Sequence, residues 1–274
     1  MLRQRVITAL LLIPLVVSGV LLLDSLLFGL VTAAVLLVGA YEMARLAGLT
    51  TRPAIGGFIL AVAACLWLAW RYMQPQGVAS LQWVMGGWWI LMTVALVARR
   101  TELVRVDAVR PTVLLLAGLV VVTAWVSIVG LHASGPNGPA LVLYLFVLIW
   151  VADSGAYFAG RAFGKTKLSP FVSPGKTWVG VLGAMAGAIL SSLALSYAGF
   201  TGHALPLELV MLSVLVTAVS IGGDLWESRL KREAGVKDSG DLLPGHGGML
   251  DRIDSLLAAA PLFALGVDLI GATA

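Results

Sequence analysis

Nine apolar runs, each long enough to cross a membrane as a helix, take up most of this chain. They cover residues 6–23, 26–41, 53–70, 81–98, 112–131, 140–160, 178–200, 207–223 and 253–270. A helix needs roughly 20 apolar residues to cross the hydrocarbon core, and in lipid the backbone must satisfy its own hydrogen bonds. The apolar–polar alternation of barrel strands is missing from these runs. The sequence therefore predicts an all-α, polytopic integral membrane protein with about nine transmembrane helices.

The composition excludes an ordinary soluble domain. Charged residues make up 12% of the chain and the mean hydropathy is +0.98, whereas soluble domains carry about a quarter charged residues. The basic start and the apolar run after it have the form of a signal sequence. Because the rest of the chain stays apolar, we interpret this segment as an uncleaved first span. A single cysteine, Cys65, excludes a disulfide framework.

The basic residues predict how the spans are oriented. With a cytoplasmic N-terminus, nine spans place every Lys and Arg of the 18 in the chain, except Arg71, in cytoplasmic segments. Because basic loops stay on the cytoplasmic side, we expect a bacterial inner membrane protein with its C-terminus in the periplasm. This bias also accounts for the sequence pI of about 9.5, so no nucleic acid is expected as a partner.

Polar groups divide the chain unevenly. Residues 1–135 contain five chemically plain apolar spans, whereas residues 136–274 contain four spans and the polar groups. We expect an N-terminal transmembrane region followed by a C-terminal catalytic transmembrane region with a cytoplasmic loop. No repeat of equal halves supports a transporter built on inverted repeats.

Charge is concentrated in residues 224–254, which hold seven of the 14 acidic and five of the 18 basic residues. Charge at membrane depth is costly and usually marks function. Helical spacing puts Glu227 and Lys231 on the same helix face as Asp224, and Ser228 lies on that face too. The two glycines before Asp224 allow another helix to approach closely.

Asp251 and Asp254 are three residues apart where the last apolar run begins, so their carboxylates share a helix face. Asp224 and Asp251 are expected to meet from adjacent helix ends and hold one cation, with Asp254 as a further ligand. Hard oxygen ligands beside basic residues predict Mg²⁺ rather than zinc. Gly247 and Gly248 in the preceding loop permit close approach of the backbone to a ligand.

Four basic residues accompany these carboxylates: Lys231, Arg232, Lys237 and Arg252. We expect them to neutralise phosphate charge, as phosphoryl or nucleotidyl transfer requires. His246 is the only histidine of the cluster. It either acts as a general acid or a phosphate hydrogen-bond donor, or holds the glycine loop in shape.

Two further segments add polar groups on the predicted cytoplasmic side. Asp153 follows a long uncharged run and Arg161 lies two turns later, so both are candidates for substrate binding. Ser173, Lys176 and Thr177 precede an apolar helix whose free N–H groups would suit a phosphate.

The segment 228–254 resembles the signature of phosphatidate cytidylyltransferases, also called CDP-diacylglycerol synthases. The matching residues are Ser228, Leu230, Lys231, Arg232, Lys237, Asp238, Gly240, Leu243, Pro244, His246, Gly247, Gly248, Met249, Asp251, Arg252, Ile253 and Asp254. Asp153, Arg161 and the run 173–177 also resemble this family. The first 140 residues resemble it only as a set of apolar spans.

The resemblance implies that CTP and phosphatidic acid react to CDP-diacylglycerol and pyrophosphate with Mg²⁺ required. It also implies Asp224 and Asp251 as metal ligands and a second, monovalent ion, K⁺, nearby. A homodimer, a polar cavity open to the cytoplasm and a lateral route for lipid follow from the resemblance alone.

Two alternatives stay open. One is a CTP-dependent transferase or kinase acting on a polyprenyl or other lipid substrate, because apolar spans do not reveal the lipid. The other is an ion or lipid transporter, which is less favoured because the acidic residues crowd one side of the membrane and the bases would repel cations.

Overall fold

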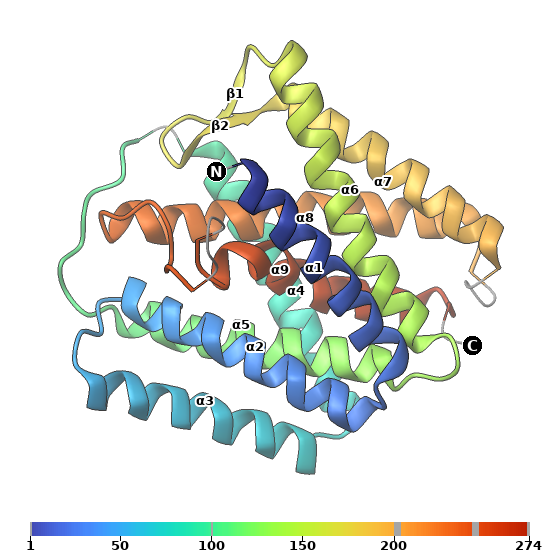
Figure 1. Ribbon diagram of the computed structural model, residues 1–274, viewed down its shortest axis with the longest axis horizontal. Helices are drawn as coiled ribbons and strands as arrows, with labels where there is room; N and C mark the ends of the chain where they lie inside the picture. Colours follow the sequence, from blue (N-terminus) through green and yellow to red (C-terminus); the bar gives the residue numbers. More distant parts are fainter. Residues whose placement is uncertain (1, 100, 200–203, 243–246, 273–274) are drawn as a thin grey trace.

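The computed structural model describes residues 2–99, 101–199, 204–242 and 247–272, with side chains from residue 10 onward. Within these ranges the chain forms nine helices and one short β-hairpin (Figure 1). The helices are α1 (Leu2–Leu22), α2 (Ser25–Leu46), α3 (Arg52–Tyr72), α4 (Pro75–Ala98), α5 (Pro111–His132), α6 (Gly138–Phe163), α7 (Trp178–Ala198), α8 (Pro206–Glu233) and α9 (Leu250–Leu269). The hairpin pairs β1 (Lys167–Ser169) with β2 (Ser173–Thr177) in antiparallel orientation.

Seven of these helices, α2 to α8, are long and apolar enough to cross a membrane, as judged over the described part of the chain. The first helix contributes a shorter apolar stretch, Leu10–Leu22. Acidic residues lie near both ends of α9, at Asp251 and Asp254 and again at Asp268. The prediction of an all-α, polytopic membrane protein is confirmed.

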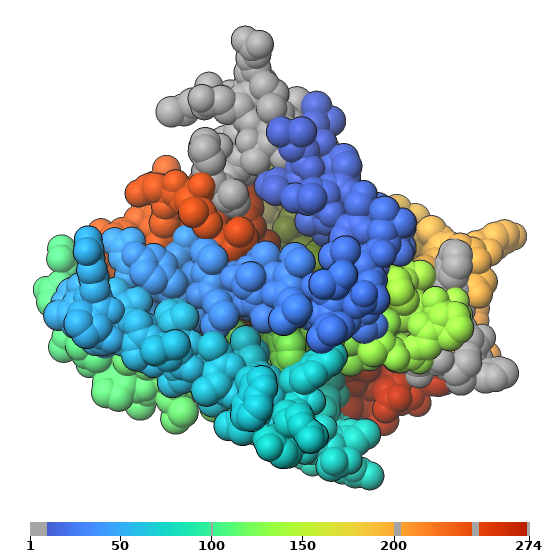
Figure 2. Space-filling view, turned by 60° about the horizontal axis from the view of Figure 1, so that its bottom comes forward, coloured from blue at the N-terminus to red at the C-terminus, as the bar shows by residue number. Residues whose placement is uncertain are grey.

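The core lies around α5 and α9, in which most residues are buried. α8 packs against α9 and α4, and α5 packs against α2 and α9. α3 lies at the periphery, where only 17% of the residues in its apolar stretch are buried (Figure 1). Figure 2 shows α2 and α3 side by side across one face of the molecule. Exposed side chains such as Leu60 and Trp67 on α3 suit contact with lipid.

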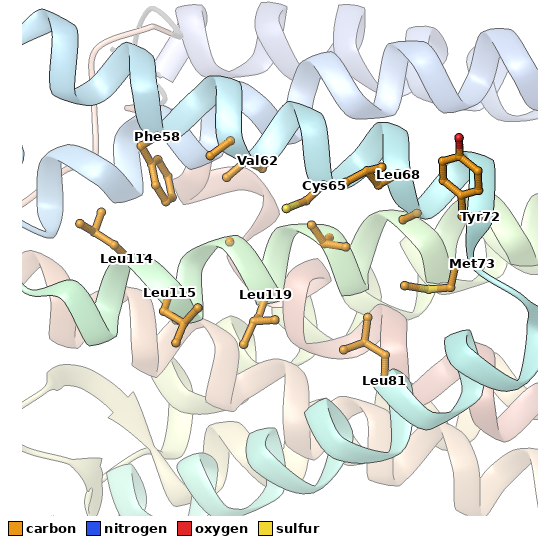
Figure 3. A pocket seen from close by; sticks show the side chains of 14 residues that line it. Phe58, Val62, Cys65, Leu68, Tyr72, Met73, Leu81, Leu114, Leu115 and Leu119 are labelled. Carbon is orange, nitrogen blue, oxygen red and sulfur yellow. The ribbon is translucent and has the colours of Figure 1, made fainter.

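An apolar groove of about 670 Å³ lies between α3 and α5 (Figure 3). Its walls include Phe58 and Leu68 from α3 and Leu115 and Leu119 from α5, and Cys65 also faces it. None of its lining residues is charged. The groove therefore has no groups for a phosphate or a cation, and the polar site lies elsewhere.

Glycines bring two pairs of helices into close contact. A Cβ atom at Gly155 of α6 would lie 2.5 Å from the carbonyl oxygen of Gly183 on α7. A Cβ atom at Gly223 of α8 would lie 2.9 Å from the Cβ of Ala258 on α9. Both distances are too short for a side chain, so these helices can only approach this closely because the side chains are missing. The predicted close approach at the glycines before Asp224 is present and brings α9 beside it.

Arg110, which immediately precedes α5, connects three parts of the fold. Its largely buried guanidinium donates to the carbonyl oxygen of Leu46 at the end of α2 and to the Glu233 carboxylate at the end of α8. Arg229 also donates to Glu233, at 2.6 Å. The backbone N–H of Arg110 donates to the Ala47 carbonyl oxygen at 2.9 Å. The ends of α2 and α8 are thus fixed relative to each other.

Substitution of this arginine should destabilise the protein strongly. Arg110→Ala leaves a buried carboxylate with one partner fewer, and breaking a buried ion pair costs about 3 kcal/mol. Arg105→Ala is the matched control, because Arg105 and its partner Asp107 are exposed, with 67% and 77% of their side chains accessible. Thermal unfolding in detergent should show a clear loss for the first variant and almost none for the second. Equal unfolding midpoints for the two variants would contradict this role.

Candidate active site

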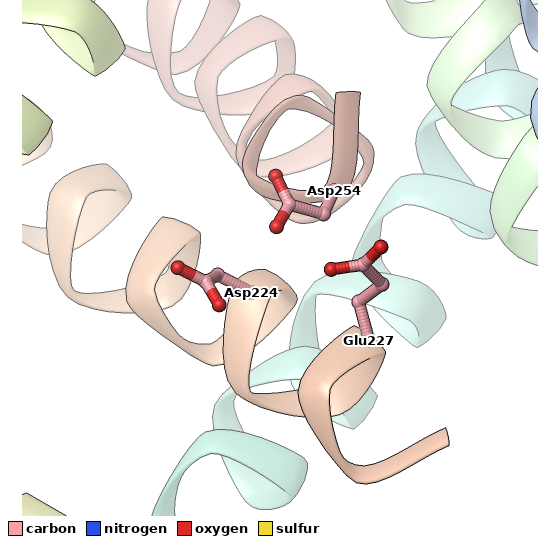
Figure 4. A group of neighbouring side chains, drawn as sticks. All are labelled: Asp224, Glu227 and Asp254. Carbon is pink, nitrogen blue, oxygen red and sulfur yellow. The ribbon is translucent and has the colours of Figure 1, made fainter. Parts of the chain in front are cut away.

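Three carboxylates converge where α8 meets α9. Asp224 and Glu227 of α8 and Asp254 of α9 each present an oxygen, and these oxygens all lie within 4.8 Å of one another (Figure 4). The spacing of three residues on α8 places the first two on one helix face. Asp254 reaches them because Gly223 lets α9 approach.

Glu227 is the most deeply buried of the three, with 2% of its surface exposed. Its Oε1 has no hydrogen-bond partner among the described residues. A buried, unpaired carboxylate oxygen is costly, and two further carboxylates beside it add repulsion. A bound cation would remove both penalties, and the all-oxygen donor set suits a hard divalent ion.

Two lysines enter this group from different elements. The Nζ of Lys176, on β2, lies 2.6 Å from Asp224 Oδ2. The Nζ of Lys231, on α8, lies 2.6 Å from Glu227 Oε2 and 2.6 Å from Asp251 Oδ1. The site therefore alternates acidic and basic groups, an arrangement that can hold a cation and phosphate oxygens side by side.

Residues predicted to share a face of α8 do so. Ser228 Oγ donates to Asp224 Oδ1 at 3.1 Å, and Lys231 pairs with Glu227 one turn earlier. The sequence placed Glu227 on this face without assigning it as a ligand. Its position three residues after Asp224 was the signal that could have identified it as a ligand.

Asp251, which the sequence pairs with Asp224, has both oxygens engaged elsewhere. One oxygen binds Lys231, and the other accepts hydrogen bonds from Gly248 N at 2.8 Å, Ser239 N at 3.1 Å and Ser239 Oγ at 3.0 Å. Burial by itself would raise the pKa of the Asp251 carboxyl, but hydrogen bonds led by those from Lys231 and Gly248 outweigh it and lower the pKa to about 2. The carboxylate that faces Asp224 is that of Asp254, whereas Asp251 shapes the loop before α9.

The hairpin brings Lys176 into position. The Oγ1 of Thr177, which ends β2, accepts a hydrogen bond from Gly180 N at 3.1 Å and caps α7. A Cβ atom at Gly160 of α6 would lie 3.0 Å from that hydroxyl oxygen. Thr177 is thus held between α6 and α7, and Lys176 next to it projects to Asp224. Ser173 begins β2 opposite Ser169, and among the described residues it makes no hydrogen bond to the three carboxylates.

The two predicted residues on α6 differ in their relation to the site. Asp153 of α6 lies within electrostatic range of Lys176, Asp224 and Arg252. Arg161 is exposed and donates to the Tyr157 hydroxyl at 2.8 Å, on the same helix.

Three basic residues and two glycines complete the predicted set. Arg232, Lys237 and Arg252 are exposed. Gly247 has a φ of +79° and lies directly against the Asp251 carboxylate, which a Cβ atom would approach to 2.7 Å. Its neighbour Gly248 supplies the N–H that Asp251 accepts. His246 falls outside the described residues.

Sequence comparison finds similar proteins that all belong to one family. The sequence model of the Cytidylyltransferase family matches residues 3–270. The chain is 44% identical over 264 residues to the phosphatidate cytidylyltransferase of Pseudomonas aeruginosa, covering 96% of both chains. It is 39% identical over 285 residues to the Haemophilus influenzae protein of that name, covering 96% of this chain and 98% of the other. The Bacillus subtilis protein is 31% identical over 264 residues, covering 94% and 95%.

Proposed function

Because the chain belongs to the cytidylyltransferase family, we infer that it is an integral membrane nucleotidyltransferase, a phosphatidate cytidylyltransferase of phospholipid synthesis. The observation that carries this conclusion is identity of up to 44% to proteins of that name over almost the whole chain. The site agrees with it, because acidic and basic groups converge at the end of long apolar helices. A lipid phosphate and a water-soluble nucleotide can meet only at such a boundary.

The reaction joins CTP to phosphatidate. A phosphate oxygen of the lipid attacks the α-phosphorus of CTP and forms a new P–O bond. The bond from that phosphorus to the oxygen bridging the α- and β-phosphates breaks, and pyrophosphate leaves with the electron pair. No covalent intermediate on the protein is needed, so catalysis rests on alignment and on neutralisation of phosphate charge.

We propose that Asp224, Glu227 and Asp254 hold the divalent cation, and that it is Mg²⁺. The support is the all-oxygen donor set, the unpaired Oε1 of Glu227 and the nearness of Lys176 to Asp224. When bound, Mg²⁺ would offset charge on the triphosphate. The second, monovalent ion, K⁺, is part of the same proposal and is assigned no ligand of its own.

The bases act on the substrates in this proposal. Lys176 and Lys231 already neutralise carboxylates of the site, and they can exchange these partners for phosphate oxygens. Arg232, Lys237 and Arg252 are exposed, so an incoming triphosphate can reach them from solvent. Asp251 keeps the loop before α9 in shape, so that the N–H groups of the loop stay in place.

We further propose the membrane setting given by the basic residues. The N-terminus and the active site face the cytoplasm of a bacterial inner membrane, where CTP is available, and the C-terminus faces the periplasm. A homodimer is included as an expectation of the family resemblance. We also propose that residues 1–135 form an N-terminal transmembrane region and that residues 136–274 form the C-terminal catalytic transmembrane region.

A transfer assay with radiolabelled CTP distinguishes the candidate lipid substrates. Purified protein should transfer label from CTP, labelled in the cytidine, to phosphatidate in the presence of Mg²⁺, and removal of the metal with a chelator should reduce this transfer by at least about a hundredfold. Polyprenyl phosphate in place of phosphatidate should give no labelled lipid. Transfer that requires the polyprenyl substrate and ignores phosphatidate would contradict the substrate assignment. Metal-independent transfer would contradict the cation site.

A further inference from the structure

Glu42 is a buried carboxylate that α2 places at the start of α9. Only 3% of its surface is exposed. It accepts hydrogen bonds from Leu250 N at 2.6 Å and Met249 N at 3.0 Å, and it shares the single hydroxyl proton of Ser239, whose Oγ is 2.9 Å away, with Asp251. These partners stand about 200 residues further along the chain. A side chain from the chemically plain part of the sequence thus contacts the loop of the catalytic part.

The carboxylate supplies a cap that α9 lacks locally. Met249 is the N-cap residue of α9, and no cap hydrogen bond comes from its own side chain. The first N–H groups of a helix need acceptors, and a negative charge is favoured there. Glu42 satisfies both needs from another helix. The start of α9, where Asp251 and Asp254 project, is therefore tied to α2.

Two glycines of the loop make room for this carboxylate. A Cβ atom at Gly248 would lie 2.5 Å from Glu42 Oε2, and one at Gly240 would collide with Glu42 Oε1. Any side chain at either position would displace the carboxylate from the N–H groups that it binds. The loop is therefore shaped around Glu42.

Ser239 connects Glu42 to the active site. Its hydroxyl lies 2.9 Å from Glu42 Oε2 and 3.0 Å from Asp251 Oδ2. Asp251 binds Lys231, and Lys231 binds Glu227 of the carboxylate group. A continuous line of polar contacts thus runs from α2 to the candidate cation site.

We propose that Glu42 is a positioning residue for the transfer reaction: it holds Ser239, Met249 and Leu250 so that Asp251 and Lys231 keep their places. Among the described residues, Glu42 makes no hydrogen bond or ion pair with Asp224, Glu227 or Asp254, so its effect passes through the loop. The inference rests on the proposed function for its kinetic consequence, but its structural consequence can be measured without any activity.

Glu42→Gln tests this role with almost no change in volume. The amide can accept through one oxygen only, and its NH₂ group would face N–H donors, so the loop should lose its anchor. The kcat of the folded variant should fall roughly tenfold or more, the size of effect expected from losing hydrogen bonds to a charged acceptor. The KM for CTP should change much less, because the exposed bases that meet the nucleotide are untouched. Glu102→Gln is the control, because Glu102 is exposed; it should leave both constants unchanged.

A kcat within about twofold of wild type in folded Glu42→Gln would overturn the proposal. Should that variant not fold, Ser239→Ala replaces it, since Glu42 still accepts from Met249 N and Leu250 N in this variant and only the hydroxyl between Glu42 and Asp251 is removed. Ser239→Ala should lower kcat severalfold at an unchanged unfolding midpoint. Wild-type kcat in this variant would overturn the proposal as well.

Limited proteolysis separates this inference from the proposed function. Trypsin can cut after Lys237, which is exposed at the edge of the loop. Glu42→Gln should be cut there at least about fivefold faster than wild type, because loss of the anchor favours local opening. The rate of cutting after Arg105 should not change. Absence of lipid labelling in the wild type would remove the proposed function, whereas equal cutting rates at Lys237 would remove the role of Glu42.

Discussion

Asp224→Ala should lower the rate of cytidylyl transfer to phosphatidate by about a thousandfold or more, since the variant loses a charged group that holds the proposed cation and pairs with Lys176. Asp224 belongs to the carboxylate group and also contacts Lys176 from the hairpin and Ser228 from its own helix. Without it, Glu227 and Asp254 alone would have to hold the cation. The measurement is kcat with radiolabelled CTP at saturating Mg²⁺.

The fold should survive this substitution. Loss of one of three neighbouring carboxylates relieves repulsion, and Lys176 and Asp224 keep 24% and 32% of their side chains accessible, so solvent reaches the freed ammonium group. The variant should therefore elute from size exclusion in detergent like the wild type. Asp107→Ala serves as the matched control, because Asp107 is an exposed acid that pairs with Arg105. Full activity of folded Asp224→Ala would exclude the proposed cation site.

Asp254→Asn and Asp251→Asn should separate cation binding from loop shape. The structure places Asp254 opposite Asp224, whereas Asp251 binds Lys231 and the loop. We therefore expect Asp254→Asn to raise the half-saturating Mg²⁺ concentration at least about tenfold and to lower kcat about a hundredfold. Asp251→Asn should also lose most of its activity, because the loop and Lys231 lose their anchor, but should bind Mg²⁺ nearly as wild type does.

Metal binding can be followed without catalysis, from the rise in unfolding temperature on addition of Mg²⁺ to each purified variant. The expected order is a full shift for wild type, a nearly full shift for Asp251→Asn and a small one for Asp254→Asn. The reverse order would favour the pair that the sequence suggested, Asp224 with Asp251, and would assign Asp254 to another role.

Local sequence patterns predicted part of this site. The face of α8 that bears Asp224 and Lys231 follows from helical periodicity, and the close approach of α9 follows from the missing side chain at Gly223. Length and hydropathy were likewise enough for a polytopic helical membrane protein, because lipid leaves the backbone few alternatives. The signature segment 228–254 indicated the family from sequence alone.

Such local patterns could not predict contacts between distant segments. Asp251 and Asp254 share a face of α9 by spacing, so nothing local distinguishes the residue that turns to Asp224 from the residue that holds the loop. The rotation of α9 about its axis decides between them, and that rotation is set by packing against α8 and α5. The same holds for the reach of Lys176 from β2 to Asp224, and for Glu42, whose partners lie about 200 residues away. Helical periodicity determines which residues share a face, but only the packing of whole helices determines what that face meets.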